Sequence, residues 1–318
     1  MKILRNPHTK NTMNTTPPKT PIHSQKSKSF LLPIGLALAT LAILPAANGQ
    51  LIYSNGFETS GNYSTGNLVG QGTNGGDIKN WTASLNGGTA KIVTSSTWNS
   101  TTMNPATGSQ MLQAQYGNSS LSLNQLIVSS NNTIKQDFNY TFKLAVQEDA
   151  LSNAAIYVGI RSSAATAAGH SNGMDFGLLR YSDGNGGYEL GFAARQSNPG
   201  GPSYATRIGT DTAPLNEWLT FSLNLDWSSL TFSGTVKDSS NNLITSFSNV
   251  AIWDKNGTMS SYGFDQLGVY VHQVGNQPYF LVDDMSVTLV PEPSTIALAL
   301  LGGAAIALYC RRNKASKS

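Results

Sequence analysis

The sequence predicts an all-β fold, an antiparallel β-sandwich, for residues 50–289. Short runs rich in Val, Ile, Thr, Tyr and Phe are separated there by clusters of Gly, Asn, Ser and Asp, which is typical of sandwiches. The clearest runs alternate apolar and polar residues with a period of two. No stretch of this region has the apolar spacing of an amphipathic helix.

Two segments show the alternation most clearly. Apolar residues occupy every second position of 138–146, and Leu219, Phe221, Leu223 and Leu225 alternate with polar neighbours in 218–226. We predict further strands over 51–58, 110–116, 121–128, 154–162, 173–181, 187–194, 203–209, 230–237, 242–248, 264–274 and 279–289.

The segments between these strands have turn chemistry. Residues 183–187, Asp-Gly-Asn-Gly-Gly, predict a hairpin loop, and residues 238–242 predict another turn. Residues 59–88 are rich in Gly and Asn and predict a long excursion over one end of the sandwich. No fixed-period repeat or linker divides the region, so we expect one domain.

Charge is segregated along the chain. Of the 20 Lys and Arg residues, six precede Gln50 and four follow Glu292, whereas all 17 acidic residues lie from Gln50 to Glu292. The middle therefore carries ten basic against 17 acidic residues, a net charge of −7. This balance argues against nucleic acid as a partner, because phosphate binding needs a basic surface.

The N-terminus has the layout of a secretory signal peptide that uses the Sec machinery. A long basic region is followed by an apolar segment, residues 30–46, and small residues Ala47 and Gly49 stand at −3 and −1 for cleavage before Gln50. Residues 1–49 are then a signal helix with a long n-region, and translation could begin at Met1 or Met13. The alternative is an uncleaved signal anchor.

The C-terminus, residues 290–318, has three parts in order. These are the triplet Pro291-Glu292-Pro293, an apolar run over 295–310 and a basic end that contains Arg311 and Arg312. The order closely resembles the PEP-CTERM sorting signal of Gram-negative bacteria. That resemblance implies export, retention in the inner membrane by the tail, recognition by an exosortase (a membrane-embedded cysteine transpeptidase), and delivery to the cell surface or extracellular matrix.

The physics of the tail agrees with a temporary anchor. As a transmembrane helix, residues 295–310 would reach roughly 24 Å, which is short of the ~30 Å hydrocarbon core. The basic residues that follow should stay cytoplasmic and place the middle outside. An ordinary anchor that is never processed is the alternative. The single cysteine, Cys310, lies in this run, so the middle has no disulfide or thiol chemistry.

Two parts of the middle suggest a more specific fold. The run 217–238 resembles the back-strand pair of concanavalin A-like (laminin-G-like) jelly rolls, in which a Trp opens a long strand and a hairpin returns through Gly-x-Val. Residues 53–58 and 280–287 resemble the paired first and last strands of such sandwiches, a pattern shared with carbohydrate-binding modules. The resemblance implies an antiparallel jelly-roll β-sandwich.

We expect no enzyme activity, no catalytic residues and no required cofactor. The middle holds two histidines, His170 and His272, without a metal-binding spacing, and it has no Gly-x-Ser-x-Gly elbow and no Walker glycine loop. A glycosidase needs two carboxylates across the scissile bond. The run Glu-x-Asp-x-x-Glu of the glucanase branch is missing: Glu148 and Asp149 are adjacent, and Glu189 stands alone.

A structural Ca²⁺ site is one candidate. Glu58 ends the first strand and Asp283 and Asp284 lie in the last, so the three carboxylates come together if these strands pair. In carbohydrate-binding modules, acids at such positions hold a structural Ca²⁺, so the resemblance implies the same role for these three residues. The alternative is solvated acids that protect edge strands from aggregation. The loop 183–189 is a second, weaker candidate, with a plain turn as its alternative.

Carbohydrate binding would need exposed aromatic rings beside polar groups. We name Trp81, Trp98 and Tyr116 as candidates, and Tyr181, Tyr188, Tyr204 and Tyr262 also lie in or beside loops, whereas Trp218, Trp227 and Trp253 suit core or edge packing. We therefore expect an exported sandwich protein that binds exopolysaccharide or another glycan. The alternatives are a secreted glycosidase or polysaccharide lyase, and a purely structural or adhesive matrix module.

Overall fold

The computed structural model describes residues 49–72, 80–115, 121–128, 132–147, 153–164, 173–182, 188–197, 203–254, 257–274, 279–291 and 301–308. Its strands form two large antiparallel sheets and one small one.

The first large sheet has nine strands in the order β16-β15-β14-β9-β18-β7-β4-β2, and β1 also pairs with β18. Its strands are β1 (Leu51–Asn55), β2 (Gly66–Asn67), β4 (Thr89–Val93), β7 (Met111–Gln115), β9 (Phe138–Gln147), β14 (Leu219–Asp226), β15 (Thr231–Lys237), β16 (Leu243–Ala251) and β18 (Tyr279–Leu289).

The second large sheet has seven strands in the order β13-β12-β11-β10-β17-β8-β3. They are β3 (Thr82–Ser84), β8 (Leu121–Leu126), β10 (Asn153–Arg161), β11 (Gly173–Ser182), β12 (Tyr188–Ser197), β13 (Ser203–Thr212) and β17 (Gln266–Val274). A hairpin of β5 (Ser96–Trp98) and β6 (Thr101–Met103) forms the third sheet, and the short helices are η1 (Thr59–Gly61) and α3 (Met259–Tyr262).

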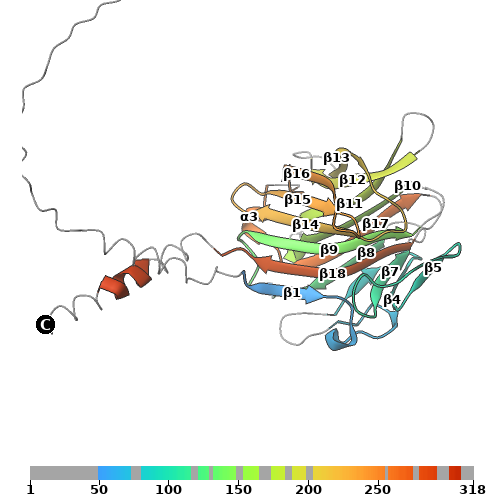
Figure 1. The fold of residues 1–318 in the computed structure, drawn as a ribbon, viewed down its shortest axis with the longest axis horizontal. Helices are drawn as coiled ribbons and strands as arrows, with labels where there is room; N and C mark the ends of the chain where they lie inside the picture. Colours follow the sequence, from blue (N-terminus) through green and yellow to red (C-terminus); the bar gives the residue numbers. More distant parts are fainter. Residues whose placement is uncertain are drawn as a thin grey trace, which may run out of the picture. The chain divides into compact units, whose positions relative to one another are not determined.

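The chain crosses between the two large sheets several times. It passes from β9 to β10, runs as a meander through β13, and returns to the first sheet as the meander β14–β16. Figure 1 shows β15, β14, β9 and β18 side by side in one layer, with β11, β10 and β17 in the layer behind. The result is a two-layer sandwich whose inner faces meet.

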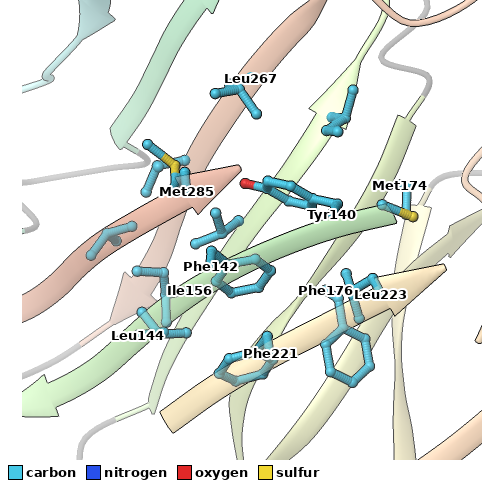
Figure 2. Packing of buried hydrophobic residues seen from close by; sticks show 14 of the residues in the cluster. Tyr140, Phe142, Leu144, Ile156, Met174, Phe176, Phe221, Leu223, Leu267 and Met285 are labelled. Atoms are coloured by element: carbon cyan, nitrogen blue, oxygen red, sulfur yellow. The ribbon is translucent and has the colours of Figure 1, made fainter. Parts of the chain in front are cut away.

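Aromatic packing fills the space between the layers. Phe142 of β9 stacks on Phe221 of β14 with ring centroids 4.7 Å apart, and Phe176 of β11 meets Phe221 edge to face at 5.8 Å. Figure 2 shows these rings among the buried side chains of both sheets. All residues of the hydrophobic clusters lie between Ile52 and Leu289, so residues 50–290 contain the complete described core.

The all-β antiparallel sandwich is confirmed, and each predicted strand is present within a few residues of its expected bounds. The prediction for 59–88 was incomplete, because β2 and β3 of that stretch extend the edges of the two sheets. Backbone pairing at a sheet edge needs no strong side-chain pattern, so such short strands leave little trace in sequence.

The terminal predictions fall mostly outside the described residues. In the predicted span 295–310, residues 301–308 are helical and exposed, and its other residues are not described. Among the residues that the structure describes, no helix is both long enough and apolar enough to cross a membrane.

Candidate ligand-binding face

The outward side of the seven-stranded sheet gathers charged and aromatic side chains. Ile156, Val158 and Ile160 of β10 belong to the core, and successive strand residues point to opposite faces, so Tyr157 and Arg161 face outward. The same argument holds on the neighbouring strands. We call this side the arginine face, and its polar and aromatic members are Tyr157, Arg161, Asp175, Tyr181, Glu189, Arg195, Arg207 and Tyr270, with Trp253 beside them.

A buried ion pair lies at the centre of the arginine face. The Nε and Nη2 groups of Arg161 donate to Oδ1 and Oδ2 of Asp175, each at 2.9 Å. The two side chains are 7% and 0% exposed. Asp175 is therefore a fixed carboxylate that depends on Arg161 for the compensation of its charge.

Glycines allow this pair to lie flat on the sheet. A Cβ atom on Gly159 would lie 2.2 Å from Asp175 Oδ1, and one on Gly268 would lie 3.0 Å from Arg161 Nε. Both contacts are too close for a side chain to be added without movement. The absence of a Cβ at these positions thus makes room for the ion pair.

Arg195 lies against two aromatic rings next to the pair. Its Cζ is 3.8 Å from the ring centroid of Trp253 and 4.7 Å from that of Tyr270, within the range of cation–π contacts. Its Nη1 is 3.7 Å from Asp175 Oδ2. Burial lowers the pKa of Arg195, and the attraction of Asp175 opposes this shift.

A second arginine cluster occupies the β12–β13 side. Arg207 stacks over Tyr181 with its Cζ 4.8 Å from the ring centroid, forms an ion pair with Glu189, and donates through Nη2 to Thr210 O at 2.9 Å. Burial raises the pKa of the Tyr181 and Tyr157 hydroxyls, so both stay protonated as hydrogen-bonding groups.

The two carboxylates of the arginine face are far apart. Asp175 pairs with Arg195 and Glu189 pairs with Tyr181 in the β11–β12 register, six residues along the strand. At about 3.3 Å per residue, the Cα atoms of Asp175 and Glu189 are roughly 20 Å apart. A glycosidase places its two carboxyl groups only about 5–10 Å apart, so these two residues do not form such a pair.

The three predicted calcium ligands do come together. β1 pairs with β18, and a Cβ on Gly56 would lie 3.4 Å from Asp284 Oδ1, 3.7 Å from Asp283 Oδ1 and 3.8 Å from Glu58 Cγ. Asp284 has a positive φ of 50° where the pairing of β18 with β9 is irregular. This irregularity lets the adjacent side chains of Asp283 and Asp284 both contact the loop after β6.

The oxygens of these carboxylates hold that loop. Asp283 Oδ2 accepts from the backbone N–H groups of Ala106 at 3.0 Å and Thr107 at 3.3 Å. Glu58 Oε1 accepts from Ser109 N at 2.7 Å. Asp284 accepts from the Thr107 hydroxyl and pairs with Lys143 Nζ at 2.9 Å.

The pKa values of Asp283 and Glu58 shift in opposite directions. Burial, and then repulsion from Asp284, raises the pKa of Asp283 to about 7, against the opposing backbone hydrogen bonds. Burial of Glu58 acts in the same direction, but hydrogen bonds from Ser109 and Gln110 outweigh it and lower the pKa of Glu58. Among the described residues, no group of three or more His, Cys, Asp or Glu side chains could hold a metal ion. Ca²⁺ binding here stays a prediction.

The aromatic candidates for carbohydrate binding differ in their exposure. Trp81 is 1% exposed and donates from Nε1 to Tyr63 OH at 2.9 Å, so it is a core residue and its selection as an exposed sugar platform was wrong. Trp98 is half-buried and packs edge to face on Tyr279 of the nine-stranded sheet, with the ring centroids 5.1 Å apart. Tyr116 and the loop 183–187 lie outside the described residues, and so do the side chains of Tyr188, Tyr204 and His272.

Sequence reasoning included Tyr181 but missed the rest of the arginine face. A signal was present: all four arginines between Gln50 and Glu292, namely Arg161, Arg180, Arg195 and Arg207, fall within one short part of the chain. The outward positions of β10, β11 and β17 also include glycines next to charged or aromatic residues, where ordinary surface strands carry Ser and Thr. Only the register of the strands shows that these residues are neighbours.

The predicted signal-peptide cleavage site and the start of the sorting motif lie close together. Leu289 N donates to Gln50 O at 2.9 Å, and Gly49 packs against Leu289. The other residues of the predicted sites, Ala47, Glu292, Pro293, Arg311 and Arg312, lie outside the described residues, whereas Pro291 is their described neighbour. The predicted signal segment and the sorting tail thus join the sandwich at the same end of the β1–β18 pair.

Solved structures similar to this chain are distant from it. The conserved carbohydrate esterase of the Shiga toxin-encoding bacteriophage phi24B is 15% identical, with a TM-score of 0.45 over 76% of this chain and 100% of that chain. The CBM2 module of the evolved Dit of Lactobacillus casei BL23 phage J-1 is 12% identical, with a TM-score of 0.41 over 77% and 98%. Peanut lectin is 13% identical, with a TM-score of 0.34 over 64% and 99%.

No curated protein matches this chain in sequence. Residues 289–313, in contrast, match the family model described as the PEP-CTERM protein-sorting motif. This match covers the predicted Pro291-Glu292-Pro293 triplet, the apolar run and the arginine pair. The chain is therefore a β-sandwich protein that carries a PEP-CTERM sorting motif at its C-terminus, which implies export, cell-surface sorting and processing by an exosortase.

Proposed function

We propose that this protein acts at the cell surface or in the extracellular matrix of a Gram-negative-type bacterium, where its sandwich binds carbohydrate through the arginine face without catalysis. The observation that carries the proposal is the group of aromatic rings, arginines and two carboxylates on a single outward sheet face. Sugars bind in this way, through ring stacking and hydrogen bonds to hydroxyls.

The proposal includes the concanavalin A-like class. The β14–β15 hairpin, which carries the strand pattern of that class, and the paired first and last strands β1 and β18 support this assignment. The wide separation of Asp175 and Glu189 supports binding over hydrolysis.

A polysaccharide affinity gel tests the binding. Residues 50–290 should be retarded by at least one neutral or acidic polysaccharide, and Tyr181→Ala should weaken the retardation. Tyr279→Ala is the matched control, because Tyr279 is equally half-buried but belongs to the nine-stranded sheet. Retardation by no polymer, together with self-association of the wild type, would favour the structural matrix module instead.

Mass spectrometry of the mature protein tests the sorting. Protein from the native envelope should begin at Gln50 and lack the residues after the Pro291-Glu292-Pro293 region. In a strain without the exosortase, the tail should be retained. An intact tail in both strains would show that the C-terminus is an ordinary anchor.

A further inference from the structure

We infer that the arginine face selects an acidic saccharide, whose negative groups are bound at its two separate arginine clusters, one at Arg195 and Trp253 and the other at Arg207. This inference rests on the proposed carbohydrate binding and adds the chemical class of the ligand.

The distribution of positive charge is the first argument. Between Gln50 and Glu292 every arginine lies on β10–β13, whereas the six lysines lie elsewhere in that region. The arginine face carries Arg161, Arg195 and Arg207 against the carboxylates Asp175 and Glu189. It therefore has a positive excess on a domain whose net charge is −7. A cationic surface of this kind concentrates anions locally.

Unpaired buried donors are the second argument. Trp253 is 4% exposed, and within the described chain its Nε1 has no hydrogen-bond partner; the same is true of the buried Nε of Arg207. Both atoms can only donate. No buried acceptor of the arginine face lacks a partner among the described residues. A ligand that offers acceptors would satisfy these donors, whose burial without a partner is unfavourable.

The floor of the arginine face is the third argument. Its remaining outward positions on β10, β11, β12 and β17 include Gly159, Gly177, Gly191, Ala193 and Gly268. The side chains of Asp175, Arg161 and Tyr181 lie over Gly159, Gly268 and Gly191, so the face offers flat guanidinium and aromatic groups on which a sugar ring can stack. Nucleic acid fits less well, because its many phosphates would meet the negative charge of the surrounding domain. A uronic acid unit combines a stacking face with one carboxylate.

The experiment compares oligosaccharides whose carboxyl groups are free with the same oligosaccharides whose carboxyl groups are methyl-esterified. Isothermal titration of residues 50–290 with polygalacturonate oligosaccharides and with their methyl esters isolates the role of the carboxylate. We expect binding to the acid to be at least about tenfold tighter, because a hydrogen bond to a charged group is worth roughly a tenfold change or more. Alginate oligosaccharides provide a second acidic probe.

Two variants assign the residues. Arg207→Gln should weaken binding of the acid about tenfold and leave binding of the ester unchanged. Trp253→Phe keeps an aromatic ring but removes the N–H donor, and should act in the same direction. Lys237→Gln, which removes an exposed cation from the nine-stranded sheet, is the control and should change neither. Thermal melts check that each variant is folded.

The outcomes separate the two proposals. Equal affinity for acid and ester, or binding of neutral glucans alone, would overturn the acidic class and keep carbohydrate binding. Binding of no saccharide would overturn both. Tighter binding of the acid that survives both face variants would overturn the assigned residues.

Discussion

Breaking the Arg161–Asp175 pair should be more damaging than removing it. In Arg161→Met, the fully buried Asp175 loses the two 2.9 Å hydrogen bonds and keeps only Arg195, whose nitrogen is 3.7 Å away. An uncompensated buried charge of this kind costs about 3–5 kcal/mol. For a domain of this size the cost corresponds to a fall in Tm of roughly 6–20 °C.

The double variant Arg161→Met/Asp175→Leu should recover most of that loss. It replaces two buried charges by apolar groups, and such replacements are often neutral or stabilising. Gly159 leaves the space in which the carboxylate lies, so a leucine at position 175 has room above the sheet.

Urea denaturation of residues 50–290, followed by tryptophan fluorescence, measures all three proteins and the single Asp175→Leu variant. The double-mutant cycle should give a coupling energy of several kcal/mol between positions 161 and 175. If the double variant is as unstable as the sum of the single variants, the two side chains are independent and our account of the arginine face is incorrect.

Three further predictions concern other parts of the sandwich. Burial raises the pKa of Asp283 in the folded protein from its ordinary value of 3.8 to about 7, so its protonation stabilises the fold at low pH and this contribution is lost as the pH rises through 7. The free energy of unfolding of the wild type relative to Asp283→Asn should therefore fall by up to about 4 kcal/mol between pH 4 and pH 8, and a flat difference in denaturation experiments would contradict the burial of this carboxyl. Phe221→Ala removes the ring stacked on Phe142 and should cost about 3–5 kcal/mol in urea titrations, whereas a cost below 1 kcal/mol would show that the core tolerates the cavity. Trp81→Phe removes the hydrogen bond to Tyr63 OH and should cost about 1 kcal/mol in the same assay without changing saccharide affinity; a loss of affinity would restore Trp81 as a binding residue.

Prediction from sequence was most accurate where one local rule dominates. The strands around Phe142 and Phe221 carry strict alternation, because one side of each strand must reach the core, and both were located within one or two residues. The proximity of Glu58 to Asp283 and Asp284 followed from the expected pairing of the first and last strands. The prediction that Trp81 is exposed was wrong, because its neighbours in sequence are typical of a loop although its side chain packs against Tyr63 and Phe57.

The sequence alone indicates the sorting of this protein and the class of its fold. Sorting signals are linear segments read by other proteins, and alternation along a strand is a local property, so both can be read from consecutive residues. The position of the proposed ligand-binding face, in contrast, depends on the tertiary structure. Arg161, Asp175, Arg195 and Tyr270 come from four strands, and their contacts depend on strand register and on the space that Gly159 and Gly268 leave. Register is set by the packing of the whole sheet against its partner, which no single segment encodes.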